Sequence, residues 1–166
     1  MSDKQWTKQE CIDEIQRIAS RLGLTGVAVK FGNRQSCGTF KVTRSRINGN
    51  WEITAKTIFL ADHLWTGRYT NKRQGYGALR EFSPLRRLVV LLHECAHMAL
   101  YATMNWATYK TIPAHGMLFK DMLKKLVREH NFRPVFKDVL SSHIVQLVNM
   151  DDGVVTDVDA KWTIVR

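Results

Sequence analysis

The sequence predicts an α+β fold with an N-terminal helix, a small antiparallel sheet, a buried helix and a further helix after it. Three observations predict this class. Apolar residues recur at helical spacing in residues 8–22, an Asn48-Gly49 pair separates two β-rich segments, and a long apolar run follows Ser83-Pro84.

The first helix and the turn after it have clear local signals. Thr7 and Glu10 have the spacing of a capping box, in which each side chain accepts a hydrogen bond from the other residue's backbone N–H. The apolar positions that follow keep helical spacing until Gly23, a residue that favours the end of a helix. We therefore expect a helix over residues 8–22.

Three short segments then have the composition of strands. Residues 27–31, 39–45 and 51–60 are rich in β-branched and aromatic residues. Asn48-Gly49 predicts a tight hairpin turn between the second and third, because both residues tolerate positive φ. We expect one small antiparallel sheet, with Trp51 in the core.

Two more helices are expected in the centre of the chain. Residues 61–82 are predicted to be a loop. Ser83 is a good N-cap and Pro84 suits the first helical position, so a helix begins there and continues to about Ala102. It is apolar on nearly every side, which predicts burial. Another amphipathic helix is expected over residues 113–130.

The C-terminal region has weaker signals. Residues 141–150 are predicted to form a short helix. Residues 154–158 and 162–165 have the composition of two final strands, with Trp162 predicted to lie in the core.

Length and composition predict one globular domain. The 166 residues suit a single unit with a core at 8–133 and a C-terminal appendage at 134–166. No apolar run approaches the roughly 20 residues that cross a membrane, and the start of the chain has no secretory signal pattern. The three cysteines form no close pair, which argues against a disulfide framework. We expect a cytoplasmic protein, in the nucleoid or on DNA, with no membrane partner.

The net charge indicates a polyanionic partner. The formal charge is +10 and the pI is about 9.8. A small domain this basic favours nucleic acid, while the alternative is a basic surface that only aids solubility.

The residues His93-Glu94-Cys95-Ala96-His97 stand within the predicted buried helix. Two histidines four positions apart lie on one face of a helix, so both imidazoles can reach a single zinc ion at about 2.0–2.1 Å. Glu94 is predicted to be the general base, because zinc lowers the pKa of a bound water toward about 7. The alternative is a pair of histidines satisfied by ordinary hydrogen bonds.

A catalytic zinc usually has a third protein ligand and an open fourth position. The metzincin pattern would place a histidine where this chain has Thr103. The thermolysin-like pattern would use a carboxylate on the next helix, where Asp121 is short and Glu129 lies near the far end. His115, at the expected start of that helix, is the preferred third ligand. Its alternative is a solvent-exposed residue.

Two elements together resemble the SprT-like family, which includes the Spartan protease. The first is the His-Glu-x-x-His helix. The second is His115-Gly116-Met117-Leu118-Phe119-Lys120, which is similar to the family's His-Gly-x-x-Phe/Trp-Lys element. The match covers roughly residues 8–130, including a basic β-region before the helix. Residues 134–166 hold no cysteines, unlike the zinc ribbon of many bacterial relatives.

The resemblance implies a zincin-like α+β metalloprotease fold with one catalytic Zn²⁺ on His93, His97 and His115, and Glu94 as the base. It also implies a protein substrate that is bound or crosslinked to DNA, with DNA stimulating cleavage. It leaves the oligomeric state open.

A basic and aromatic segment between the sheet and the buried helix is the candidate nucleic-acid surface. Cations attract phosphate and aromatic faces stack on unpaired bases, which favours single-stranded regions. The alternative is a solvated loop whose aromatic residues pack on the body. The candidate residues are Trp65, Arg68, Tyr69, Lys72, Arg73, Arg86 and Arg87.

Two other functions stay open on the sequence. One is a regulatory protease that cuts a single partner. The other is a zinc-stabilised DNA-binding protein without turnover, whose metal site would be closed by four ligands.

Overall fold

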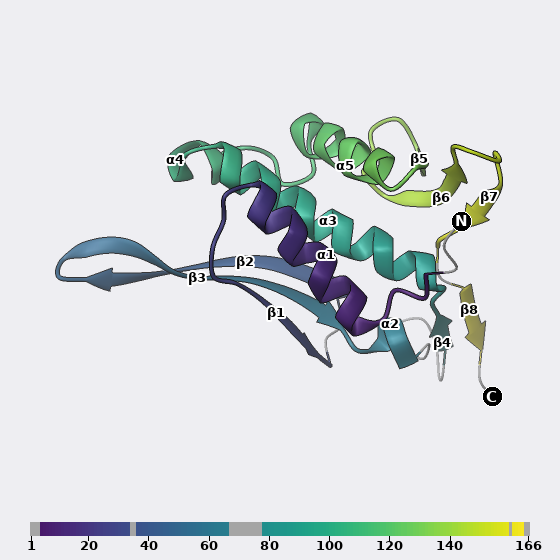
Figure 1. Ribbon diagram of the computed structural model, residues 1–166, viewed down its shortest axis with the longest axis horizontal. Coiled ribbons are helices and arrows are strands. Elements are labelled where there is room, and N and C mark those ends of the chain that lie inside the picture. The colour runs from purple at the N-terminus through teal and green to yellow at the C-terminus, as the bar shows by residue number, and fades with distance from the viewer. Residues whose placement is uncertain (1–3, 34–35, 67–77, 160, 165–166) are drawn as a thin grey trace.

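The computed structural model describes residues 4–33, 36–66, 78–159 and 161–164. It shows a mixed α+β chain, as predicted. A three-stranded sheet carries α1 and α3 on one side, and α5 lies on the other side of α3 (Figure 1). Within the described ranges, no helix has the length and apolar character needed to cross a bilayer.

The helices have well-defined starts. Thr7 caps the first one with both bonds of the predicted capping box, since its N–H donates to Glu10 Oε1 at 3.0 Å and its Oγ1 accepts from the Glu10 N–H at 3.1 Å. Ser83 caps the long central helix. The helices of the described residues are α1 (Lys8–Arg21), α2 (His63–Thr66), α3 (Pro84–Thr103), α4 (Trp106–Tyr109) and α5 (Met117–Glu129).

The N-terminal sheet has the strand order β1-β3-β2 and is mixed rather than antiparallel. β2 (Gly38–Ile47) and β3 (Asn50–Ala61) form the predicted hairpin, with φ of 51° at Asn48 and 82° at Gly49. β1 (Val27–Gly32) pairs with β3 in parallel. The antiparallel expectation for this strand was wrong, since β1 lies on the edge of β3 opposite β2 and runs in the same direction as β3.

The outer part of this hairpin, residues 43–54, extends beyond the helices in Figure 1 and is called the hairpin arm below. A register shift between Thr43 and Arg44 marks its start. Trp51 is 61% exposed there. Its predicted place in the core was wrong, because the helices that cover the inner half of the sheet do not extend over the arm.

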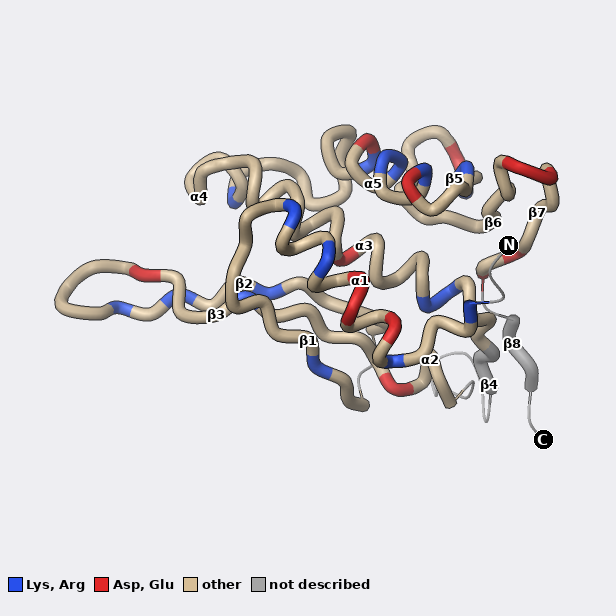
Figure 2. Tube along the Cα trace, viewed as in Figure 1, with Lys and Arg blue, Asp and Glu red and all other residues tan. Residues whose placement is uncertain are grey.

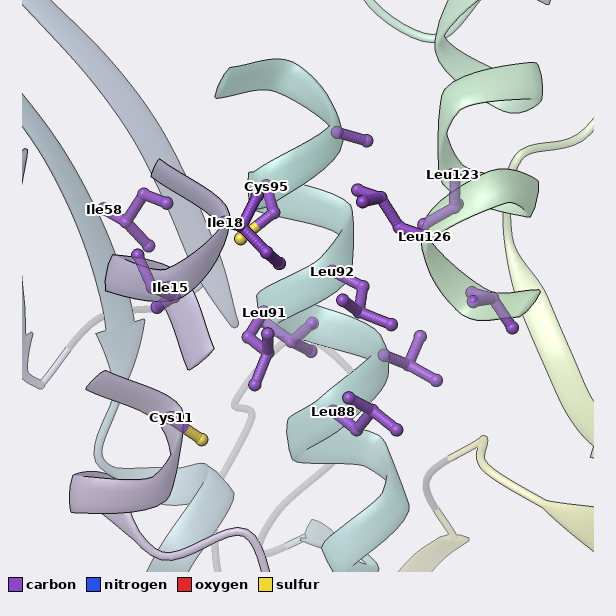
Figure 3. Close-up of a cluster of buried hydrophobic side chains, with 14 of the residues drawn as sticks. Cys11, Ile15, Ile18, Ile58, Leu88, Leu91, Leu92, Cys95, Leu123 and Leu126 are labelled. Atoms are coloured by element: carbon purple, nitrogen blue, oxygen red, sulfur yellow. The ribbon is translucent and has the colours of Figure 1, made fainter. Parts of the chain in front are cut away.

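The central helix α3 is buried as its apolar sequence predicted. Figure 3 shows Leu88, Leu91, Leu92 and Cys95 of α3 between side chains of α1 and β3 on one side and of α5 on the other. Leu91 and Cys95 have no exposed surface. This packing holds the helix that carries the His-Glu-x-x-His residues in a fixed position.

The C-terminal region has its two predicted final strands, β7 (Val155–Asp157) and β8 (Lys161–Ile164), but differs from the prediction at residues 141–150. Residues predicted as a short helix form the strand β6, which pairs with a strand that was not predicted and with the shorter β7. Burial in the tertiary structure explains why this segment is a strand, since Ile144 and Leu147 of β6 pack into the core. The strands are β5 (Phe132–Phe136), β6 (Ile144–Asn149) and β7 (Val155–Asp157).

Two short strands complete the described chain. β4 (Ala78–Glu81) pairs antiparallel with β8 (Lys161–Ile164). The side chain of Trp162, predicted to lie in the core, is outside what the structure describes.

Candidate metal centre

Three histidines meet between α3 and the start of α5. His93 and His97 project from successive turns of α3, and His115 comes from the segment just before α5. The Nε2 atom of His115 lies 3.1 Å from Nε2 of His93 and 3.2 Å from Nε2 of His97. The structure therefore brings together the three residues that the sequence suggested as ligands.

The spacing of these nitrogens fits a tetrahedral metal ion. Nitrogens bound at about 2.0–2.1 Å in a tetrahedron lie about 3.3–3.4 Å from one another. The two measured separations are close to that value. Hydrogen bonding alone explains the arrangement less well, because a neutral His115 has at most one proton on Nε2 for two facing nitrogens. A cation at the centre satisfies all three.

The surroundings keep two of these imidazoles neutral. Burial, together with the charges of neighbouring histidines, lowers the pKa of His93 to about 3 and that of His97 to about 4. The ring of Phe119 lies against both, with centroid separations of 4.7 Å and 4.4 Å. Neutral imidazoles are the form that binds metal.

Glu94 lies beside this cluster and is 5% exposed. Burial raises the pKa of its carboxyl to about 7, opposed by a hydrogen bond from the Phe40 backbone N–H on β2. Glu94 therefore lies beside the backbone of β2 and also lines the pocket.

The close approach of β2 to α3 depends on Gly38. A Cβ atom built at this position would lie 2.9 Å from Val90 Cγ1 and 3.1 Å from Glu94 Cγ. Only a residue without a side chain lets the strand come so near without displacing its neighbours. Gly38 therefore sets the distance between the edge strand and the Glu94 side chain.

The residues at the ligand positions of the metzincin and thermolysin-like patterns lie outside the histidine cluster or have other partners. Glu129 pairs with Arg21 at 2.6 Å, and the Thr103 hydroxyl donates to the Ala99 carbonyl at 3.0 Å. Asp121 lines a separate surface hollow with Glu129. Among the described residues, His93, His97 and His115 form the one cluster whose ligand atoms can hold a metal.

The remaining histidines have structural surroundings. His63 is buried against Phe82, with ring centroids 5.0 Å apart. His130 lies 3.1 Å from a Glu14 oxygen, and His143 lies 3.1 Å from an Asp159 oxygen.

The candidate nucleic-acid residues are only partly described, since Arg68, Tyr69, Lys72 and Arg73 lie outside the described residues. The other three take part in internal packing. Trp65 donates from Nε1 to the Trp6 carbonyl at 2.9 Å. Arg87 donates to the Leu64 carbonyl at 2.8 Å and lies over the Trp65 ring.

Arg86, the third of these, is 8% exposed and faces a pocket rather than solvent. Sequence reasoning placed it on a nucleic-acid surface. Its side chain is buried, so the described structure gives it no such surface. One feature of the sequence could have indicated this. Arg86 stands seven residues before His93, so it lies two helical turns away on the same face of the helix.

Tyr101 of α3 packs among aromatic rings. Its ring lies 5.8 Å from that of Phe40 and 5.6 Å from that of Tyr109, measured between centroids. These contacts give Tyr101 a packing role.

Comparisons of the chain with protein-family models, with curated proteins and with solved structures found no match.

Proposed function

We propose that this chain is a zinc-dependent metalloendopeptidase. The observation that carries the proposal is the meeting of three histidine Nε2 atoms next to the buried Glu94, with an open pocket in front of them. A structural zinc site is closed by four protein ligands, whereas a catalytic site keeps a position for water. Three histidines with a neighbouring carboxylate are the set of residues expected at a catalytic zinc site.

The zinc ion and the protein side chains have different roles in the proposed reaction. Zinc, when held by His93, His97 and His115, supplies a Lewis acid for a scissile carbonyl and lowers the pKa of water. Glu94 takes a proton from the attacking water at its carboxylate and delivers it to the leaving amine. The Phe40 N–H favours the ionised form of this carboxylate.

The edge strand β2 offers a place for an extended substrate. It forms one edge of its sheet, and Gly38 at its start lines the same pocket as Glu94. A peptide can pair with the backbone of an edge strand, which gives affinity with little dependence on sequence. Such a peptide would run past Glu94 and the three histidines.

The proposed substrates are proteins bound or crosslinked to DNA. The net charge of +10 and the resemblance to the SprT-like family support this class. The hairpin arm is the proposed DNA-binding surface. Arg44 lies over the exposed Trp51 ring at 5.4 Å, and Arg46 is opposite Trp51 in the register of the two strands. Figure 2 shows basic positions along this arm. Cations beside an exposed indole suit single-stranded DNA.

The deciding experiment measures cleavage of a DNA-bound protein by wild type and by Glu94→Gln, with and without single-stranded DNA, while zinc content is recorded. We expect Glu94→Gln to keep its zinc and to lose activity by about 10²–10⁴-fold, the usual contribution of a general base. DNA is expected to stimulate the wild type.

Each contrary outcome has a definite meaning. Retained activity in Glu94→Gln would remove this carboxylate from the mechanism. A cleavage rate that does not depend on DNA would favour a regulatory protease of narrow specificity. Zinc at full stoichiometry without cleavage in any condition would favour a zinc-stabilised DNA-binding protein.

A further inference from the structure

A pocket of about 350 Å³ extends from the metal centre along the N-terminal half of α3. This volume is within the range of small-ligand sites. Val89, Val90 and Leu123 supply apolar walls, and residues 141–144 border the pocket. His93 and Glu94 line the end of the pocket next to the histidine cluster, and Arg86 also lines the pocket.

Arg86 is a buried cation that has no counter-ion among the described residues. It is 8% exposed, and within the described part of the chain its buried Nε has no hydrogen-bond partner and its guanidinium no ion pair. Its backbone N–H donates to the carbonyl oxygen and to Oγ of Ser83, and neither bond involves the guanidinium. A buried charge is costly unless it is paired. The part of the chain that the structure describes therefore offers this side chain no anion, and the side chain faces a pocket that can admit one.

The other charged groups of the pocket do not supply that anion. Glu94 lines the pocket, but no ion pair joins its carboxylate to Arg86 in the described structure. The His143 side chain lines the pocket too, and its Nε2 is 3.1 Å from Asp159 Oδ1. Asp159 is thus engaged with His143, and Arg86 remains unpaired.

We propose that this pocket binds a carboxylate of the substrate close to the scissile bond. The inference rests on the proposed peptidase function. A carboxylate is the anion that a peptide itself carries, and the guanidinium fork matches it with two parallel hydrogen bonds. The carboxylate belongs to an Asp or Glu side chain or to the C-terminus of the peptide, and both sources have the same chemistry.

The position of the carboxylate relative to the cleaved bond follows from the helix. Arg86 and His93 are seven residues apart, which is about 10 Å along the axis of α3. An extended peptide covers about 3.3–3.6 Å per residue. The recognised group therefore lies within about three residues of the scissile bond.

The test measures binding of small probes to the zinc-loaded, isotope-labelled protein by NMR. N-acetyl-glutamate methylamide is compared with N-acetyl-glutamine methylamide, and N-acetyl-alanine with its amide. We expect a carboxylate probe to shift the Arg86 Nε–H resonance and to bind at least about tenfold more tightly than its amide, the value of a charge-assisted hydrogen bond. The first pair reports a side-chain carboxylate and the second a C-terminal one.

Three variants make the test specific. Arg86→Gln should abolish the preference for the acid, while Arg86→Lys, which keeps the charge, should retain part of it. Arg128→Gln removes an exposed charge from α5 and should leave the preference unchanged. Zinc content and the spectrum of each variant establish that it is folded.

Two results would overturn the inference: equal binding of acid and amide by the wild type, or an unchanged preference in folded Arg86→Gln. The second would assign the carboxylate to the metal instead. Failure of the peptidase function is distinguishable, because probe binding needs no turnover. Peptide cleavage without an acid preference would reject the pocket inference alone, and an Arg86-dependent preference without cleavage would reject the peptidase function alone.

Discussion

His115 Nε2 lies 3.1 Å from His93 Nε2 although the two residues are separated by 22 positions. The first belongs to the segment before α5 and the second to the middle of α3. Packing of α5 against α3 through Leu123 and Leu126 brings them together. The candidate metal centre therefore depends on the packing of these two helices.

His115→Ala is expected to reduce zinc affinity by more than about 100-fold. Loss of a residue that only orients a ligand costs 10–100-fold, so loss of a ligand costs more. Competition titration with a chelating dye measures this affinity. Asp121→Ala is the matched control on the following helix, because Asp121 is exposed and lies outside the histidine cluster. An unchanged affinity in His115→Ala would show that another residue is the third ligand.

Gly38→Ala is expected to lower the free energy of unfolding by about 1–3 kcal/mol, the range for an overpacked contact. The added methyl would lie 2.9 Å from Val90 Cγ1 and 3.1 Å from the Phe59 carbonyl oxygen. It would also push against Glu94, so peptidase activity should fall further than stability alone predicts. Urea denaturation and a peptide assay measure the two effects.

Gly32→Ala is the control for that variant. Gly32 ends β1, and a Cβ atom there would meet nothing within 4 Å. We expect its unfolding free energy to stay within about 0.5 kcal/mol of the wild type. Equal stability of both variants would mean that β2 can move away from α3 without cost.

Glu14 is expected to contribute stability that disappears in acid. Burial favours its protonated form, but hydrogen bonds from His130 and Arg17 outweigh this and lower its pKa to about 2. Since the ordinary pKa is 4.5, the contribution is fully present above pH 4.5 and is lost as the pH falls toward 2. A shift of this size corresponds to at most about 3 kcal/mol.

Glu14→Gln tests this pH dependence. The wild type should lose more unfolding free energy than the variant between pH 5 and about pH 3, measured by urea denaturation at each pH. The variant should already be less stable at neutral pH, because its amide cannot pair with Arg17. Parallel curves for the two proteins over this interval would show that Glu14 does not titrate in the expected range.

Trp51→Ala in the hairpin arm is expected to weaken binding of single-stranded DNA by about 1–3 kcal/mol, the value of one stacked base. Its effect on the free energy of unfolding should be within about 1 kcal/mol, because the side chain is 61% exposed and packs against the exposed arm residue Arg44. Fluorescence anisotropy with a labelled oligonucleotide measures the affinity.

Arg46→Gln separates charge from stacking on the same arm. Loss of one phosphate contact should lower the dependence of log affinity on log salt by about one. Lys125→Gln, an exposed position on α5, removes the same charge elsewhere. If the Lys125 variant lost as much affinity as the arm variants, the arm would have no special role in DNA binding.

Local signals in the sequence were sufficient for several elements. The capping box of Thr7 and Glu10, the Asn48-Gly49 turn and the Ser83 cap are all present as predicted. Each acts through bonds or backbone angles within a few residues, so it depends little on the rest of the fold. The strand at residues 144–149 was predicted as a helix, because its apolar run is compatible with either structure until its partners are known.

The sequence by itself determined that His93 and His97 share one face of a buried helix with Glu94 between them, since the helical repeat requires it. Only the tertiary structure decided that His115 completes the cluster, that Arg86 faces the adjoining pocket and that Trp51 lies in solvent. These relationships join segments that are distant along the chain. They arise from packing between helices and sheet, which no local pattern of residues specifies.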